Sequence, residues 1–301
     1  MRGALHLLTP KEAGAFLSLM AAGRAWERPS WQRYFGMTAE EWIAAMDALR
    51  HVVREALAEK PHTREELAAA VGRRRGLRRL AEGLGSSWGT LLKPLAWQGD
   101  LCFGPSRDGR VTFMRPEDAS SRWAGVADPD EAAPGAIVSY LAAFGPATID
   151  AFGSWLAGGW FGKRQPRTWF AALTDRVAEI EVDGERAYVL EEDLDELAST
   201  RPTSAVRLLP GFDQYVLGPG TKDGRVVPSP RRAAVSKQSG WISPVVVARG
   251  VVCGTWELES DRVRVAWFRE AGRLPRRALE TEVARLSSIV DRGLLATISL
   301  A

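Results

Sequence analysis

Asp213 is the acidic residue whose neighbours best suit a chemical role. It follows a strand-like run that breaks at Pro210-Gly211, and it stands between Phe212 and Tyr215. Burial among apolar side chains raises a carboxyl pKa, and a carboxylate held in this way can act as a general base. The alternative is a packed corner in which the carboxylate caps a turn, which is a common role of aspartate. Asp213 is therefore a candidate catalytic residue with a structural alternative.

A second candidate site is a group of basic residues between Pro219 and Gly240. The segment is rich in glycine, proline and serine and contains one acid, Asp223. We expect it to be a surface loop that packs no core. Its charges suit contacts with successive phosphodiester groups, and a solvated loop without a ligand is the alternative. The basic residues are Lys222, Arg225, Arg231, Arg232 and Lys237.

The charges of the chain fall into blocks. The net charge is +3, but residues 1–115 contain 18 basic and 12 acidic side chains, residues 116–200 contain 6 and 16, and residues 201–301 contain 16 and 9. Two basic blocks around an acidic one indicate a polyanion-binding surface in the basic blocks. Lysine supplies only six of the basic residues. The excess of arginine favours bidentate contacts with phosphate.

The composition argues against several classes of protein. A hydrophobic content of 46% with 26% charged residues is ordinary for a globular domain. No apolar run approaches the roughly 18 residues that span a bilayer, and the N-terminus lacks the layout of a secretory signal. We expect a cytoplasmic monomer. Cys102 and Cys253 lie far apart in apolar runs and have no metal-ligand spacing, so we expect free thiols, no metal and no cofactor.

The order of elements over residues 37–122 predicts a winged-helix unit. Threonine–glutamate pairs with capping-box spacing open a long helix at Thr38 and a short helix at Thr63. A third helix is predicted from Ser86 to Gln98, and a hairpin over residues 101–114 follows. In this fold the third helix enters a DNA groove and the hairpin, or wing, touches the backbone. A protein-interaction scaffold is the alternative use of the fold.

Arg107 lies in GPSRDG (residues 104–109), the expected tip of the first wing, and Arg110 follows this tip directly. Arg107 and Arg110 are therefore candidate phosphate contacts. The same order of elements recurs over residues 128–200, with a hairpin that turns at Asp183-Gly184, and this recurrence predicts tandem winged-helix units. The second unit is acidic, so we expect it to bind a DNA groove poorly despite its basic residues Lys163, Arg164 and Arg167.

The remaining segments complete an α+β chain. Residues 1–36 are expected to form a strand, a helix and an aromatic-rich connector, as the remnant of a preceding unit. Residues 201–301 are expected to form a β-rich, barrel-like C-terminal domain, against which the tandem winged-helix units pack. A hairpin turning at Arg249-Gly250 lies at its centre, and it ends in a helix over residues 278–290 and a strand-like tail.

Three segments carry a resemblance to a known family. They are LLPGFDQYVLG (residues 208–218), SPVVVARGVVCGTWELE (residues 243–259) and the opening MRGALHLL. Together they resemble winged-helix DNA-binding proteins related to the AlkZ-like DNA glycosylases. The likeness covers nearly all of the chain, and its C-terminal motifs are the most specific part.

The resemblance implies binding to duplex DNA and hydrolysis of the N-glycosidic bond of alkylated bases. The family places a catalytic Gln-x-Gln or Gln-x-Asp motif in a first winged helix, before the segment that is similar to MRGALHLL. We expect this chain to lack that unit and its motif, whether as a truncated start, a fragment or a non-catalytic paralogue. The expected function is therefore DNA binding without catalysis. The alternatives are a non-enzymatic transcription regulator, an interaction scaffold, or a protein with a small-molecule pocket in its C-terminal domain.

Overall fold

The computed structural model describes residues 7–85, 89–158, 164–173, 175–201 and 203–301. The chain forms two compact units. Unit 1 comprises Met1–Tyr140 and Leu156–Asp175, and unit 2 comprises Leu141–Trp155 and Arg176–Ala301. The expected domain boundaries stay predictions. The expected strand over residues 1–8 lies mostly outside the described residues.

Capping residues begin the first helices of unit 1. Thr9 and Glu12 form a complete capping box at the start of α1, with Pro10 in the first turn, and Thr38 and Glu41 form another at α3. The start of α3 at Thr38 was predicted from its capping-box spacing. The expected connector over residues 21–36 instead contains two short helices, held by aromatic packing on α3. These elements are α1 (Pro10–Ala22), η1 (Ala25–Glu27), α2 (Pro29–Phe35) and α3 (Ala39–Glu59).

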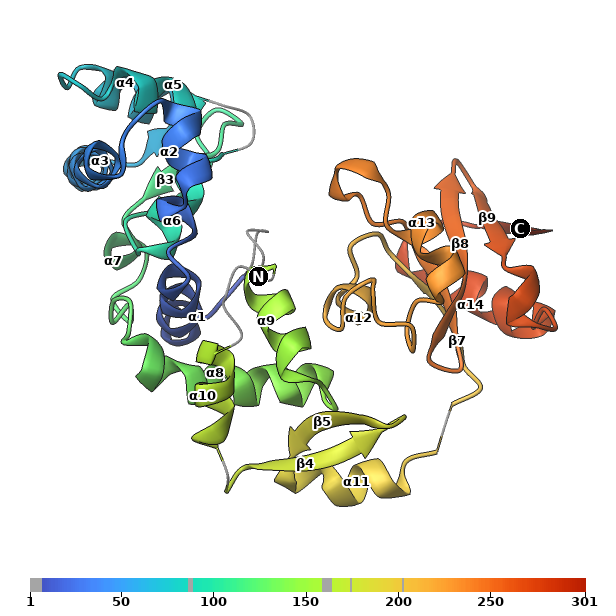
Figure 1. Ribbon diagram of the computed structural model, residues 1–301. Helices are drawn as coiled ribbons and strands as arrows, with labels where there is room; N and C mark the ends of the chain where they lie inside the picture. The colour runs from blue at the N-terminus through green and yellow to red at the C-terminus, as the bar shows by residue number, and fades with distance from the viewer. Residues whose placement is uncertain (1–6, 86–88, 159–163, 174, 202) are drawn as a thin grey trace. The chain divides into compact units, whose positions relative to one another are not determined.

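A small sheet and three helices follow α3 (Figure 1). The sheet has the order β1-β3-β2, so the strand before α4 pairs with the second strand of the hairpin. The start of the expected third helix, Ser86, lies outside the described residues, and α6 is shorter than expected because residues 89–91 are not helical. A helix that was not expected, α5, precedes it and buries Leu80 and Leu84. The elements are β1 (His62–Thr63), α4 (Arg64–Gly72), α5 (Arg78–Gly85), α6 (Leu92–Trp97), β2 (Cys102–Phe103) and β3 (Thr112–Met114).

The next elements repeat part of this order. Ala147, just before α9, forms a bridge with Tyr188 on β5, as His62 before α4 pairs with Phe113 on β3. The hairpin turns at Asp183 and Gly184, which both have positive φ, as a tight hairpin turn requires. The identification of both groups of elements as winged helices stays a prediction. The elements are α7 (Pro116–Ala119), α8 (Pro129–Phe144), α9 (Ile149–Ala157), α10 (Arg164–Ala171), β4 (Val177–Val182) and β5 (Glu185–Leu190).

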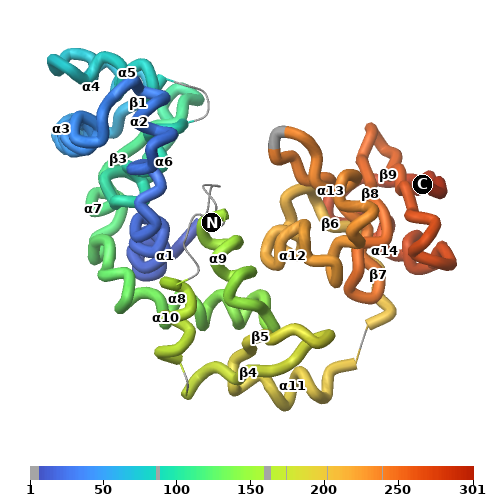
Figure 2. Tube along the Cα trace, in the orientation of Figure 1, coloured from blue at the N-terminus to red at the C-terminus, as the bar shows by residue number. Residues whose placement is uncertain are grey.

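Unit 2 is built on a five-stranded sheet of order β10-β9-β8-β7-β6. Its strands β7, β8 and β9 are labelled in Figures 1 and 2. The tail strand β10 pairs in parallel with β9, and the other neighbours are antiparallel. The expected barrel-like closure is not found among the described strands, because β6 and β10 are separate edges. The elements are β6 (Val206–Leu209), β7 (Val245–Ala248), β8 (Val251–Glu259), β9 (Arg262–Trp267), β10 (Leu295–Leu300) and the closing helix α14 (Arg276–Ile289).

Two apolar clusters lie against this sheet. Leu279 and Val283 of α14 pack in one cluster with Val246 and Val265. The segment between β6 and β7 supplies the other through Val227 and Val235, among others, so the prediction that residues 219–240 pack no core is wrong. Its valines are too far apart to show as a periodic pattern. The short elements of unit 2 are η2 (Glu191–Asp193), α11 (Leu194–Ser199), α12 (Gln214–Leu217), η3 (Ser229–Arg231), α13 (Arg232–Val235), η4 (Gln238–Gly240) and η5 (Arg269–Ala271).

Candidate functional site

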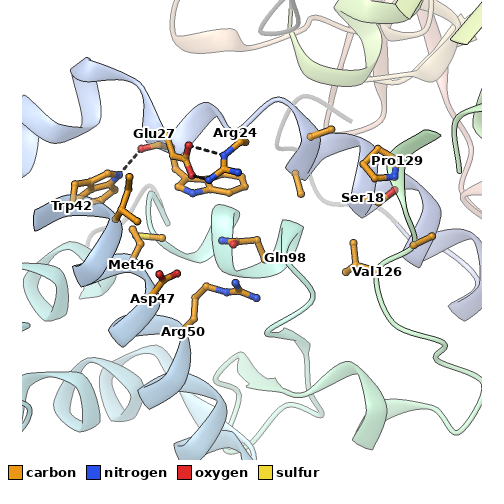
Figure 3. Close-up of a pocket in the computed structure, with 15 residues that line it drawn as sticks. Ser18, Arg24, Glu27, Trp42, Met46, Asp47, Arg50, Gln98, Val126 and Pro129 are labelled. Atoms are coloured by element: carbon orange, nitrogen blue, oxygen red, sulfur yellow. Dashed lines mark hydrogen bonds and ion pairs between the residues drawn. The ribbon is translucent and has the colours of Figure 1, made fainter. Parts of the chain in front are cut away.

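Unit 1 contains a cavity of about 440 Å³ (Figure 3). Its walls come from the end of α1, from η1, from α3 and from the end of α6. The indole nitrogen of Trp42 donates to the carbonyl of Trp26 at 2.7 Å, which fixes η1 against α3. No local sequence pattern indicates this cavity, because its walls come from separate elements. The polar and charged residues that line it are Ser18, Arg24, Glu27, Asp47, Arg50 and Gln98.

Charged side chains of both signs line the cavity. Arg24 forms an ion pair with Glu27, and this hydrogen bond, together with the charges of Glu27 and Asp47, holds the pKa of Arg24 above its usual value. Asp47 is exposed, and in the described part of the chain no hydrogen bond to it is found. Tryptophan rings with carboxylates beside them can accept a flat polar or cationic ligand.

The two wing arginines differ in what they contact. Arg107 donates to Glu66 of α4 and to the carbonyl of Pro61, so its guanidinium holds the hairpin against α4 and the residues before it. Arg110 is exposed, and no ion pair involving it is found among the residues described. Arg107 is thus engaged within unit 1, whereas Arg110 acts on Glu65 only through its charge, and phosphate contact by either arginine stays a prediction.

The basic residues of the segment 219–240 divide in the same way. Arg225 makes two hydrogen bonds to Asp223, at 3.0 and 2.8 Å. Arg231 makes two to Glu270, at 2.5 and 2.8 Å, and its guanidinium lies 4.6 Å from the ring centre of Phe268. These two arginines stabilise unit 2. The remaining three are exposed, and the described residues supply no ion pair to any of them: Lys222, Arg232 and Lys237.

Asp213 lies at the start of α12. Its Oδ1 accepts the backbone N–H of Tyr215 at 2.8 Å, which is the geometry of a helix N-cap. The Tyr215 hydroxyl in turn donates to the carbonyl of Gly250 at 2.7 Å. The capping role that the sequence offered as an alternative is therefore present. Catalysis by this carboxylate stays a prediction.

Two of the three basic residues noted in the second unit lie on α10. Arg164 and Arg167 are exposed, and Lys163 lies outside the described residues. On the same helix, Gln165 and the indole of Trp169 donate to Asp130 of α8, at 2.9 and 2.7 Å. The acidic Asp130 is thus used to hold α10 to α8. No DNA contact follows from this geometry.

The comparison with known proteins identifies the family. A family model for AlkZ-like DNA glycosylases matches residues 1–289.

The chain belongs to this family.

Relatives confirm the membership across the chain. A Streptomyces sahachiroi protein named interstrand DNA cross-link repair glycosylase is 45% identical over 288 residues, which are 95% of this chain and 76% of the relative. The solved structure of the Streptomyces sahachiroi DNA glycosylase AlkZ matches with a TM-score of 0.93 and 44% identity, over 99% of this chain and 80% of that one. The expected likeness to AlkZ-like DNA glycosylases and the mixed α+β fold are therefore confirmed, and the winged-helix identification and the missing first unit stay predictions.

The expectation that this AlkZ-like chain carries no Gln-x-Asp pair needs correction. Gln98 and Asp100 have this spacing, just after α6. Asp100 is only 1% exposed, and the guanidinium of Arg50 donates to it at 2.6 and 3.2 Å. Desolvation raises the pKa of Asp100, and the partly opposing attraction of Arg50 does not cancel this. Gln98 lines the cavity and donates to the carbonyl of Pro94 at 3.0 Å, so the pair matches the motif in spacing while Asp100 has a structural partner.

Other expectations concern metals, thiols and membranes. In the described part of this AlkZ-like protein, no group of three histidine, cysteine or acidic side chains is placed to hold a metal ion. Cys102 and Cys253 are free thiols, and desolvation raises the pKa of Cys102 to about 11. None of the described helices is long and apolar enough to cross a bilayer. Unit 2 also has a cavity of about 310 Å³ beside Arg249 and Phe268. The small-molecule pocket that was named as an alternative for the C-terminal domain stays a prediction.

Proposed function

We propose that this protein binds duplex DNA and removes alkylated bases by hydrolysis of the N-glycosidic bond. The observation that carries the proposal is the 45% identity, over 95% of the chain, to a relative named as a cross-link repair glycosylase. Bases joined by a bifunctional alkylating agent and singly alkylated bases both carry a carbon substituent on a base nitrogen, so these two kinds of lesion belong to one substrate class. The winged-helix units would supply the scaffold for the DNA.

Four exposed cations support the binding part of the proposal. Each can reach a phosphate oxygen without breaking an ion pair found among the described residues. Contacts of this type position a protein on the duplex without reading its sequence. The engaged arginines Arg107, Arg225 and Arg231 are assigned to structure instead. The four cations are Arg110, Lys222, Arg232 and Lys237.

A base-release assay tests the catalytic part. The protein is incubated with methylated duplex DNA, and the released bases are separated by chromatography and identified by mass spectrometry. We expect methylated purines in the supernatant and alkali-labile abasic sites in the DNA. DNA binding without base release would favour a non-enzymatic DNA-binding protein, and loss of both would favour an interaction scaffold.

The variant Asp213→Asn separates catalysis by Asp213 from capping. Asparagine is an equally good N-cap residue, so α12 should keep its start and the melting temperature should not change. A carboxylate that acts as general base contributes roughly 100-fold or more to the rate. We expect base release to fall by about that factor with DNA affinity unchanged. Unchanged release would show that Asp213 only caps α12, and Asp47, which lines the cavity of unit 1, would then be the next candidate for the general base.

A further inference from the structure

Two aromatic side chains of unit 2 are exposed next to one another. Phe212 precedes α12 and Trp241 follows η4, and they are 43% and 58% exposed. Their ring centres are 5.1 Å apart and the rings stand at 85°. In such an edge-to-face pair one ring has a face that the other does not cover. Large exposed rings in contact differ from scattered surface apolar residues and indicate a binding surface.

The backbone holds Phe212 in place at a conformational cost. Its φ is +63°, a left-handed value that is unusual for a bulky residue. The preceding Gly211 lies so close to residue 242 that an added Cβ would come within 2.8 Å of the carbonyl oxygen of Ile242. Asp213 caps the following turn, and Ile242 is anchored in the apolar cluster beneath. Strain of this kind persists where surrounding contacts impose it, and it is concentrated at functional sites.

A basic residue contacts the backbone of the aromatic pair, and a second one precedes it in the chain. The backbone N–H of Lys237 donates to the carbonyl of Trp241 at 2.8 Å, so the two residues face each other across a small loop. Arg232 lies on α13, five residues before Lys237. Both side chains are exposed, and within the described chain neither is seen in an ion pair. Asp213 is the acid closest in sequence to the pair, and one of its oxygens is already used as the helix cap.

We propose that Phe212 and Trp241 form a platform on which an unpaired nucleobase of bound DNA stacks. The proposal deepens the proposed function and rests on it, since the DNA must first be bound. Aromatic faces accept any base, and adjacent cations follow the backbone, which is the combination that recognises unpaired nucleotides. One ring of the pair supports the other in edge-to-face contact, and Lys237 and Arg232 would hold the phosphates that flank the stacked base.

The test compares two duplexes of equal length and sequence. One is fully paired, and the other carries a single unpaired 2-aminopurine at its centre. Affinity is measured by fluorescence anisotropy from an end label, and stacking by quenching of 2-aminopurine. We expect the protein to prefer the duplex with the unpaired base and to quench its fluorescence.

Variants then assign the effect to the platform. Trp241→Leu and Phe212→Asn remove the rings, and asparagine tolerates the left-handed backbone at residue 212. Each should weaken binding to the unpaired-base duplex roughly tenfold and abolish quenching, with affinity for the paired duplex unchanged. Trp241→Phe should keep most of the preference, because it keeps an aromatic face. Tyr34→Leu, which removes an exposed ring of unit 1, is the matched control and should have no effect.

The outcomes separate the two proposals. Equal binding of both duplexes by the unaltered protein, or equal weakening of both by the variants, would overturn the platform and leave DNA binding intact. Absence of binding to either duplex would overturn the proposed function, and the platform with it. Melting curves of each variant distinguish a lost contact from a lost fold.

Discussion

At the scale of single residues, Glu66 shows how one carboxylate joins local and tertiary structure. It accepts the backbone N–H of Thr63 at 2.7 Å in the capping box of α4, and it also receives the guanidinium of Arg107 from the wing. The backbone hydrogen bond from Thr63, followed by the hydrogen bond from Arg107, lowers the pKa of Glu66 to about 2. The folded state therefore favours the ionised carboxylate.

This carboxylate gives a pH-dependent contribution to stability. Because the folded pKa is lowered, the contribution is complete above the ordinary value of about 4.5 and is lost as the pH falls towards 2. We expect Glu66→Gln to lower the melting temperature near neutral pH, and the difference from the unaltered protein to shrink below about pH 4.5. Melting curves by circular dichroism across this range measure it, with Glu59→Gln, at the exposed end of α3, as control. A difference that stays constant with pH would contradict the assignment.

At the scale of elements, α14 is joined to the edge strand β6 by a buried acid. Glu282 is 2% exposed and accepts the backbone N–H of Leu208 at 3.0 Å and Arg285 at 2.7 Å. Desolvation raises its pKa, but the hydrogen bonds from Arg285 and Leu208 outweigh this and hold the pKa below the usual value. The carboxylate thus takes the place of a neighbouring strand for one donor of β6.

Removal of this acid should cost stability. In Glu282→Ala the N–H of Leu208 loses its partner in a buried place, which costs about 1–3 kcal/mol. Urea denaturation measures the change. Glu280→Ala on the exposed side of the same helix should stay within about 0.5 kcal/mol of the unaltered protein. Equal effects of the two substitutions would show that helix propensity, and not the contact with β6, is responsible.

At the scale of the whole molecule, the salt dependence of DNA binding gives the number of phosphate contacts that the protein makes. Each contact releases counterions, so the slope of log K against log salt changes by about 0.9 for each contact on duplex DNA. We expect Arg110→Ala, Lys222→Ala, Arg232→Ala and Lys237→Ala each to flatten the slope by about this amount, on two unrelated duplexes alike. Fluorescence anisotropy over a salt series measures it.

Arg231→Ala is the matched control, because Arg231 precedes Arg232 and is already paired with Glu270. It should lower the melting temperature and leave the slope unchanged. Binding that is insensitive to salt, or an Arg231 variant that acts like the Arg232 variant, would contradict this division between free and engaged cations.

The sequence by itself determined the features that depend on near neighbours in the chain. The capping boxes at Thr38 and Thr63 join residues three apart, and the turns at Asp183-Gly184 and Arg249-Gly250 need only the local backbone, so these were predicted. The C-terminal motifs, through their resemblance, likewise indicated the family.

Tertiary structure alone decided which of the candidate cations form ion pairs with acids far away in the sequence. Arg231 pairs with Glu270, 39 residues away, and Arg107 with Glu66, 41 residues away. Neither pairing can be predicted from the sequence, because the two partners of each ion pair come together only when the chain folds. The cavity of unit 1 and the contact between Phe212 and Trp241 arise in the same way. The physical reason is that helices and turns are set by local hydrogen bonds, whereas exposure, ion pairing and strain are set by elements that meet only after folding.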